Sequence, residues 1–167
     1  SEMRDSQKRV EDWMRQVPSQ TVNAHPTIPD LKTRILRARL MLEEVLETIE
    51  DGLGLDVYAL LNEERDERFW ISKDYIGIWH FDDNRTGLRP DLVKIADGLA
   101  DQAVVLLGTA VACGIDLEPI YNLVMDNNDL KLKTGTVDEH GKLVKAKDHP
   151  DPMPEIQKAL DVQRDRA

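Results

Sequence analysis

The chain has 167 residues, of which 41% are hydrophobic and 32% charged, a composition typical of a soluble globular protein of one domain. Its formal net charge of −10 argues against non-specific binding to nucleic acid, which needs a basic surface, but suits a protein whose acidic residues hold a divalent metal ion. Cys113 is the only cysteine, and we find neither an uninterrupted apolar run of ~18 residues nor an N-terminal signal stretch, so we expect a cytoplasmic protein without disulfides or a membrane partner.

The N-terminal part of the chain predicts two helices joined by a linker. The first covers about Arg4 to Gln16, where apolar residues recur at helical spacing. Three prolines between residues 18 and 29 predict an extended linker. A long helix then begins near Pro29-Asp30, where the aspartate can cap it, and ends at Asp51-Gly52. Its many apolar positions predict burial on more than one side.

The middle of the chain is harder to assign. Val57 to Arg68 predicts a shorter helix, and residues 69–90 are aromatic and then turn-rich, which predicts a hairpin-like excursion or an ordered loop. A second long helix is expected from about Pro90 to Ala112. Its second half, Ala103 to Cys113, is almost wholly apolar and should lie in the centre of the fold. Gly114 is the expected C-cap.

The C-terminal part predicts two more helices around a polar segment. One runs from Asp116, as N-cap, to about Leu130, and a short last helix covers Pro154 to Gln163. Between them, residues 138–141 predict a turn. The expected fold is therefore all-α: an antiparallel helical bundle with an irregular or hairpin-like insertion around 69–90. We expect a single domain over 1–167, with an N-terminal helix and linker (1–28) and a C-terminal arm (131–167).

Acidic residues recur on the two long helices at spacings that place them on one face of each helix. These residues are Glu43, Glu44, Glu47 and Glu50 on the first, and Asp97 and Asp101 on the second. Two like charges ~4 Å apart repel by ~4 kcal/mol at an effective dielectric of ~20, so a cluster of such residues needs a cation. Carboxylate oxygens suit Mg²⁺ or Mn²⁺. A solvated helix face is the alternative, and the spacing alone leaves both interpretations open.

The segments around these acids resemble the MazG-like, all-α nucleoside triphosphate pyrophosphohydrolases. They are Leu40–Glu47, Ala96–Asp101, Leu107–Thr109 and Gly114–Asp116. The tail is similar to the phage and bacterial branch near dimeric dUTPases and phosphoribosyl-ATP pyrophosphohydrolase. It contributes Val124–Lys131, Asp138–Lys142 and Lys145. The resemblance covers most of residues 31–156.

The resemblance implies a helical bundle, usually a homodimer, that uses Mg²⁺ or Mn²⁺ to hydrolyse a (deoxy)nucleoside triphosphate to the monophosphate and pyrophosphate. By this similarity Glu44, Glu47 and Asp101 are metal ligands, and Glu43 orients or deprotonates the attacking water. The implied substrate-binding residues are Asn128, Lys131, Lys142 and Lys145. dUTP and modified nucleotides are candidate substrates, but the sequence does not tell which base and sugar are preferred.

One position departs from the family pattern. The family usually carries a glutamate three residues before the last aspartate, where this chain has Gly98. Asp97, one turn from Asp101, is the candidate for the missing metal ligand. The departure leaves the number of metal ions open and motivates a different hypothesis, a catalytically inactive helical scaffold. Phosphoribosyl-ATP hydrolysis is a further alternative. The insertion at 69–90 and the long tail of this chain depart from the compact form of the enzymes that catalyse that reaction.

Overall fold

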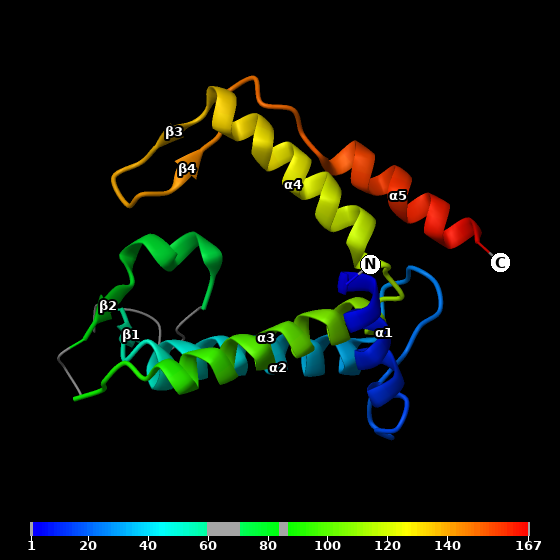
Figure 1. Cartoon of the computed structure of the whole chain (residues 1–167), viewed down its shortest axis with the longest axis horizontal. Coiled ribbons are helices and arrows are strands. Elements are labelled where there is room, and N and C mark those ends of the chain that lie inside the picture. Colours follow the sequence, from blue (N-terminus) through cyan, green and yellow to red (C-terminus); the bar gives the residue numbers. More distant parts are fainter. Residues whose placement is uncertain (1, 60–70, 84–86, 167) are drawn as a thin grey trace, which may run out of the picture. The chain divides into compact units, whose positions relative to one another are not determined.

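A computed structural model describes residues 2–59, 71–83 and 87–166, and these are mostly helical (Figure 1). The predicted all-α class is confirmed, with only two small strand pairs in the described ranges. The chain divides into two compact units, one formed by residues 1–37 and 106–167 and the other by residues 38–105. The boundaries between the units fall inside two helices, α2 (Leu31–Glu47) and α3 (Leu92–Ala112).

In the first unit, the linker after helix α1 (Glu2–Met14) caps the end of α3. The backbone N–H of Asn23 donates to the Val111 carbonyl, and its side chain donates to the Ala112 carbonyl at 2.7 Å. Helix ends leave such carbonyls without intrahelical partners, so the linker completes the helix. Gly114 ends α3 with a positive φ of 67°, as expected of a C-cap, and a side chain there would collide with the His25 carbonyl.

Two glutamines hold the turn between α3 and α4 (Leu117–Thr134). Gln7 of α1 donates to the Ile115 carbonyl and accepts from the Leu117 N–H. Gln163 of α5 (Met153–Asp165) donates to the Asp116 carbonyl at 3.0 Å and accepts from the Asp116 N–H at 2.9 Å. Asp116 sits at the N-cap position, as predicted, although its side chain makes no capping hydrogen bond. The carboxylate instead pairs with Arg4 at 3.0 Å.

The predicted turn at residues 138–141 joins the strands β3 (Thr136–Val137) and β4 (Leu143–Val144), which pair antiparallel. One carboxylate oxygen of Asp138 accepts the N–H groups of His140 and Lys142, both at 2.9 Å. Gly141 follows with a φ of 81°, a conformation that glycine adopts at little cost.

The second unit contains a strand pair that the sequence did not predict. Strand β1 (Asp56–Tyr58) runs antiparallel to β2 (His80–Asp82), with Val57 opposite Phe81. The expected helix from Val57 is therefore wrong at its start, and its remainder lies largely outside the described residues. The segment before β2 holds a 3₁₀ helix, η2 (Lys73–Ile78), so the described part of the 69–90 insertion is irregular, as expected. Phe69 and Trp70 are not among the described residues.

Few of the described apolar residues are fully buried. The buried cluster lies in the first unit and joins Met14 to Val111 and Ala112. The expectation that Ala103 to Cys113 is central therefore holds for its last turn, because Val104 and Leu106 are exposed. By length and composition alone α3 is apolar enough to cross a membrane, a test that the core helices of soluble proteins also pass. Charged residues such as Lys94 interrupt the apolar positions of this helix, so the sequence contains no continuous apolar run of ~18 residues there.

Candidate functional site

The two acid-bearing helices pack antiparallel within the second unit. The Gln102 amide of α3 donates to the Thr48 hydroxyl at 2.8 Å. The Asp91 N–H, just before α3, donates to the Gly52 carbonyl at 2.8 Å. Residue numbers therefore rise along one helix in the direction in which they fall along the other. This pairing places the end of α2 beside Asp101, as the sequence predicts for two antiparallel helices.

Glu44 is the centre of the acidic cluster. Burial raises the pKa of its carboxyl, and the nearby charges of Glu47, Asp101 and Glu43 raise that pKa further, together with a hydrogen bond to Glu47. Its Oε2 atom is buried and has no hydrogen-bond partner among the described residues. Three of the carboxylates singled out in the sequence, those of Glu43, Glu47 and Asp101, therefore act on the charge of Glu44, and one buried oxygen of Glu44 lacks a partner among the described residues.

Two other acids are not part of this group as described. Asp97 is exposed, and its charge is not among those that raise the Glu44 pKa. Glu50 is also exposed and lies in a π-helix, η1 (Thr48–Gly52), which continues α2. Within the described ranges, no three His, Cys, Asp or Glu side chains converge closely enough to hold a metal ion as they stand. The four carboxylates share one region without forming a finished coordination shell.

Gly98 lies where the resemblance led us to expect a glutamate, and its surroundings show why a longer side chain does not fit there. Gly98 is buried on the face of α3 that meets Thr48. A β-carbon added there would collide with the Thr48 hydroxyl and lie 3.0 Å from the Thr48 β-carbon. The position therefore has no room for a carboxylate side chain. Sequence analysis identified neither Thr48 nor Gln102; their only signal is that they directly follow Glu47 and Asp101.

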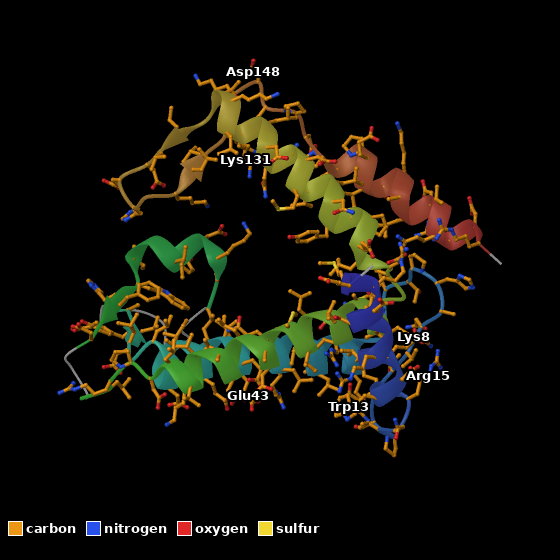
Figure 2. All side chains as sticks on the ribbon, in the orientation of Figure 1. Lys8, Trp13, Arg15, Glu43, Lys131 and Asp148 are labelled. Carbon is orange, nitrogen blue, oxygen red and sulfur yellow. The ribbon has the colours of Figure 1, made fainter. Side chains whose placement is uncertain are left out.

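The expected substrate-binding residues lie in the first unit. Asn128 and Lys131 stand one turn apart on α4 and line one cavity of about 330 Å³ together with Leu143. The Asn128 amide donates to the Met125 sulfur at 3.9 Å, which is a weak contact. Lys142 and Lys145 flank β4 and are exposed. Figure 2 labels Lys131 on α4 and, in the other unit, Glu43 on α2.

None of these three lysines makes an ion pair with a described residue, in contrast to Lys8, which pairs with Glu11 and Asp12. Unpaired ammonium groups remain available to an anionic ligand. The Lys131 ammonium and the Asn128 amide give this cavity hydrogen-bond donors that suit phosphate or sugar oxygens, and the Asp129 carboxylate, which also lines it, adds an acceptor.

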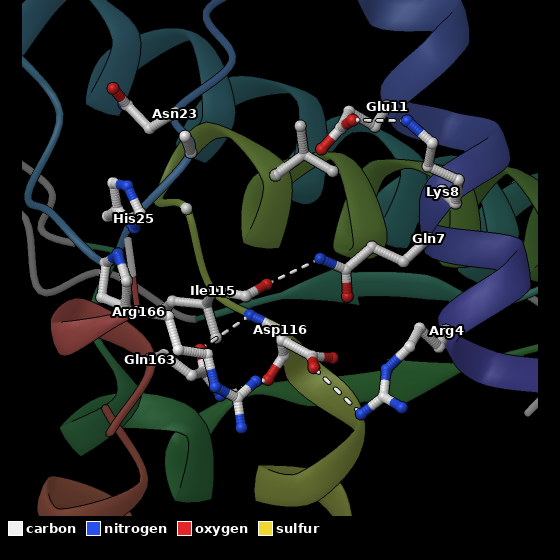
Figure 3. Close-up of a pocket in the computed structure, with 14 residues that line it drawn as sticks. Arg4, Gln7, Lys8, Glu11, Asn23, His25, Ile115, Asp116, Gln163 and Arg166 are labelled. Atoms are coloured by element: carbon white, nitrogen blue, oxygen red, sulfur yellow. Dashed lines mark hydrogen bonds and ion pairs between the residues drawn. The ribbon is translucent and has the colours of Figure 1, made fainter. Parts of the chain in front are cut away.

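A second cavity of about 280 Å³ surrounds the α3–α4 turn (Figure 3). Several of its polar side chains are already engaged: Gln7 and Gln163 bond the backbone, and Arg4 pairs with Asp116. Lys8 likewise pairs with Glu11. The cavity contains none of the site residues expected from the sequence, and its contacts hold three helices and the linker together.

No protein-family model matches this chain, and no curated protein matches it either. The resemblance to MazG-like enzymes therefore rests on the residues named above.

Proposed function

We propose that this protein is a Mg²⁺-dependent nucleoside triphosphate pyrophosphohydrolase, which converts a (deoxy)nucleoside triphosphate to the monophosphate and pyrophosphate. The observation that carries the proposal is the environment of Glu44. It combines an unpartnered buried carboxylate oxygen with three further carboxylates on two antiparallel helices. A buried polar atom without a partner costs free energy, and a bound cation would remove that cost.

The donor set fits a hard divalent cation, because Mg²⁺ and Mn²⁺ prefer carboxylate oxygens. Glu44, Glu47 and Asp101 would hold the ion, and Asp97 is a further candidate one turn away. The ion would neutralise phosphate charge and orient the triphosphate. Carboxylates without a cation repel one another, so we expect their side chains to draw together when the metal binds.

The remaining chemistry falls to the chain's own residues. Phosphoanhydride hydrolysis depends on positioning, charge neutralisation and an activated water. The water oxygen would bond to the α-phosphorus while Glu43 accepts a proton from that water. The bond from the α-phosphorus to the α–β bridging oxygen would break, which releases pyrophosphate. Asn128 and Lys131 would hold sugar or phosphate oxygens, and Lys142 and Lys145 would add positive charge.

The exposed apolar side chains of the second unit support a homodimer as the working form. Met41, Leu42 and Val45 on α2 and Leu99 and Val104 on α3 are each more than a third exposed. Apolar surface of this kind on neighbouring helices is typical of an interface. We propose that a second copy of the chain covers it and that the protein works in the cytoplasm.

The test is pyrophosphate release by purified protein from canonical and modified triphosphates, dUTP and phosphoribosyl-ATP, with Mg²⁺ or Mn²⁺. We expect at least one substrate to be hydrolysed. Glu43→Gln should lower kcat by about 10²–10⁴-fold, the usual contribution of a general base. Glu155→Gln, the same change at an exposed α5 glutamate paired with Lys158, is the matched control and should retain activity.

Two outcomes would contradict the proposal. Nucleotide binding without turnover in the presence of metal would favour the inactive scaffold. Turnover of phosphoribosyl-ATP alone would assign the protein to histidine synthesis instead.

A further inference from the structure

The strongest feature outside the proposed chemistry is the contact between Thr48 and Gly98. Thr48 is 5% exposed and directly follows Glu47. Its hydroxyl donates to the Glu44 carbonyl at 2.7 Å and accepts from the Gln102 amide at 2.8 Å. The hydroxyl thus uses one donor and one acceptor function, and each bond leads to a residue at the acidic cluster or next to it.

Gly98 makes this arrangement possible. Its missing side chain leaves a notch in α3, and the Thr48 side chain fills that notch. Threonine is β-branched and stiff, and here it is bonded on two sides, so it cannot move aside cheaply. The separation of the two segments is therefore constrained at this point, one turn from both Glu44 and Asp101.

The backbone at Thr48 is also unusual. The Thr48 carbonyl accepts the Leu53 N–H at 2.9 Å, which closes a π-turn, and the π-helix η1 begins directly after Glu47. π-turns are uncommon and frequently occur at functional sites. The wider turn begins at Thr48, directly after Glu47, which still has α-helical backbone angles (φ −59°, ψ −42°).

We propose that Thr48 and Gln102 are positioning residues for the metal site, and that Thr48 occupies the space that a fourth carboxylate would need. The Thr48–Gln102 bond sets the separation between Glu44 on one helix and Asp101 on the other. Gly98 is required because any side chain there displaces Thr48. This inference rests on the proposed function, since it assigns a role at the same site.

The experiment measures the dissociation constants of Mn²⁺ alone and Mg²⁺ alone by calorimetry, without nucleotide. Thr48→Val keeps the shape of the side chain and removes the hydroxyl. We expect it to weaken metal binding by about 10–100-fold, the usual effect of losing a group that orients a ligand. Thr48→Ser keeps the hydroxyl and should bind metal nearly as the unchanged protein does.

Gln102→Met tests the same hydrogen bond from the other side, because it removes the amide that donates to the Thr48 hydroxyl. Gln102 is partly exposed, so the substitution should disturb packing little. Because both changes break one bond, Thr48→Val and Gln102→Met together should weaken binding no more than either alone. Thr134→Val is the matched control. Thr134 makes the same bond to the carbonyl four residues earlier, on α4, and its loss should leave metal affinity unchanged.

The outcomes separate the two proposals. If the unchanged protein binds metal and Thr48→Val binds it equally well, Thr48 is only a packing residue and the positioning role is overturned while the metal site stands. If the unchanged protein binds no divalent metal, the proposed function and this inference both fail. Melting temperatures without metal, measured for every variant, show whether a loss of affinity reflects unfolding.

Discussion

At the scale of single residues, Glu44 shows how burial and neighbouring charge create a group that needs a ligand. An exposed glutamate loses little when it ionises, but Glu44 must do so beside Glu47 and Asp101 in a partly dehydrated position. The folded protein therefore holds a proton on this carboxyl more tightly than the unfolded chain does. A bound cation would reverse the preference, because it stabilises the ionised form.

The raised pKa of Glu44 gives a prediction about pH. Its contribution to stability is complete below the unfolded pKa of about 4.3 and is lost as the pH rises through the higher folded pKa. Without metal, Glu44→Gln, which resembles the protonated form, should therefore stabilise the protein at neutral pH and have little effect near pH 4. Urea unfolding of both proteins over this range measures the difference. A Glu44→Gln variant that is less stable at neutral pH would contradict the prediction.

At the scale of helices and strands, local patterns explain much of the fold. Spacing and caps predicted α1, the start of α2, α3 and α5 to within a few residues. Strand β1 was missed because its partner β2 is distant in sequence, and pairing between distant segments leaves no local pattern. Asp116 occupies the predicted N-cap position, but its carboxylate pairs with Arg4, and Gln7 of another helix accepts the Leu117 N–H group; neither contact leaves a local pattern in the sequence.

The candidate site was predictable only in part, for similar reasons. Helical spacing grouped Glu43, Glu47 and Glu50, with Glu44 beside them. In the structure the charges of Glu43, Glu47 and Asp101 act on Glu44, whereas that of Glu50 does not. Spacing could not show that Gly98 faces Thr48, because that depends on how the two helices are rotated against each other. Asp97 shares a face of α3 with Asp101 in any helix, yet its exposure follows from the packing of its neighbours.

The glutamine contacts at the α3–α4 turn give a prediction about stability. Gln163→Leu would leave the Asp116 N–H and carbonyl without their partners, and an unsatisfied buried group costs about 1–3 kcal/mol. We expect the free energy of unfolding to fall by about that amount. Gln157→Leu, on the same helix, removes a hydrogen bond to the exposed Asp161 side chain instead; it is the control and should have a small effect. If the two substitutions lowered the free energy of unfolding equally, the Gln163–Asp116 hydrogen bonds would have no special role in stability.

The β3–β4 hairpin gives a separate prediction. Hydrogen bonds from the Lys142 and His140 N–H groups hold the pKa of Asp138 below its usual value. The ionised Asp138 carboxylate therefore stabilises the folded hairpin above its unfolded pKa, and this stabilisation is lost as the pH falls through its lower folded pKa. Asp138→Ala should speed hydrogen exchange of the His140 and Lys142 amides, measured by NMR. Glu139→Ala, beside it but without these bonds, should not.

At the scale of the whole molecule, many large apolar side chains are exposed, and their exposure calls for a partner that covers them. Single exposed apolar residues are normal in soluble proteins, but Leu99 and Val104 on α3 lie on a helix next to Met41 and Val45 on α2. Removing such a surface from water stabilises by about 25 cal/mol per Å² of apolar area. A stable dimer buries about 800 Å² on each partner, and a second copy is the simplest cover for these helices.

We therefore expect the protein to sediment as a dimer at micromolar concentration. Leu99→Lys, which places a charge in the proposed interface, should shift the molecular mass measured by light scattering towards the monomer. Thr134→Lys, at an exposed polar position of α4, should leave the mass unchanged. A monomeric unchanged protein would contradict the dimer, and flotation of the protein with neutral phosphatidylcholine vesicles would indicate that lipid rather than a second copy covers α3.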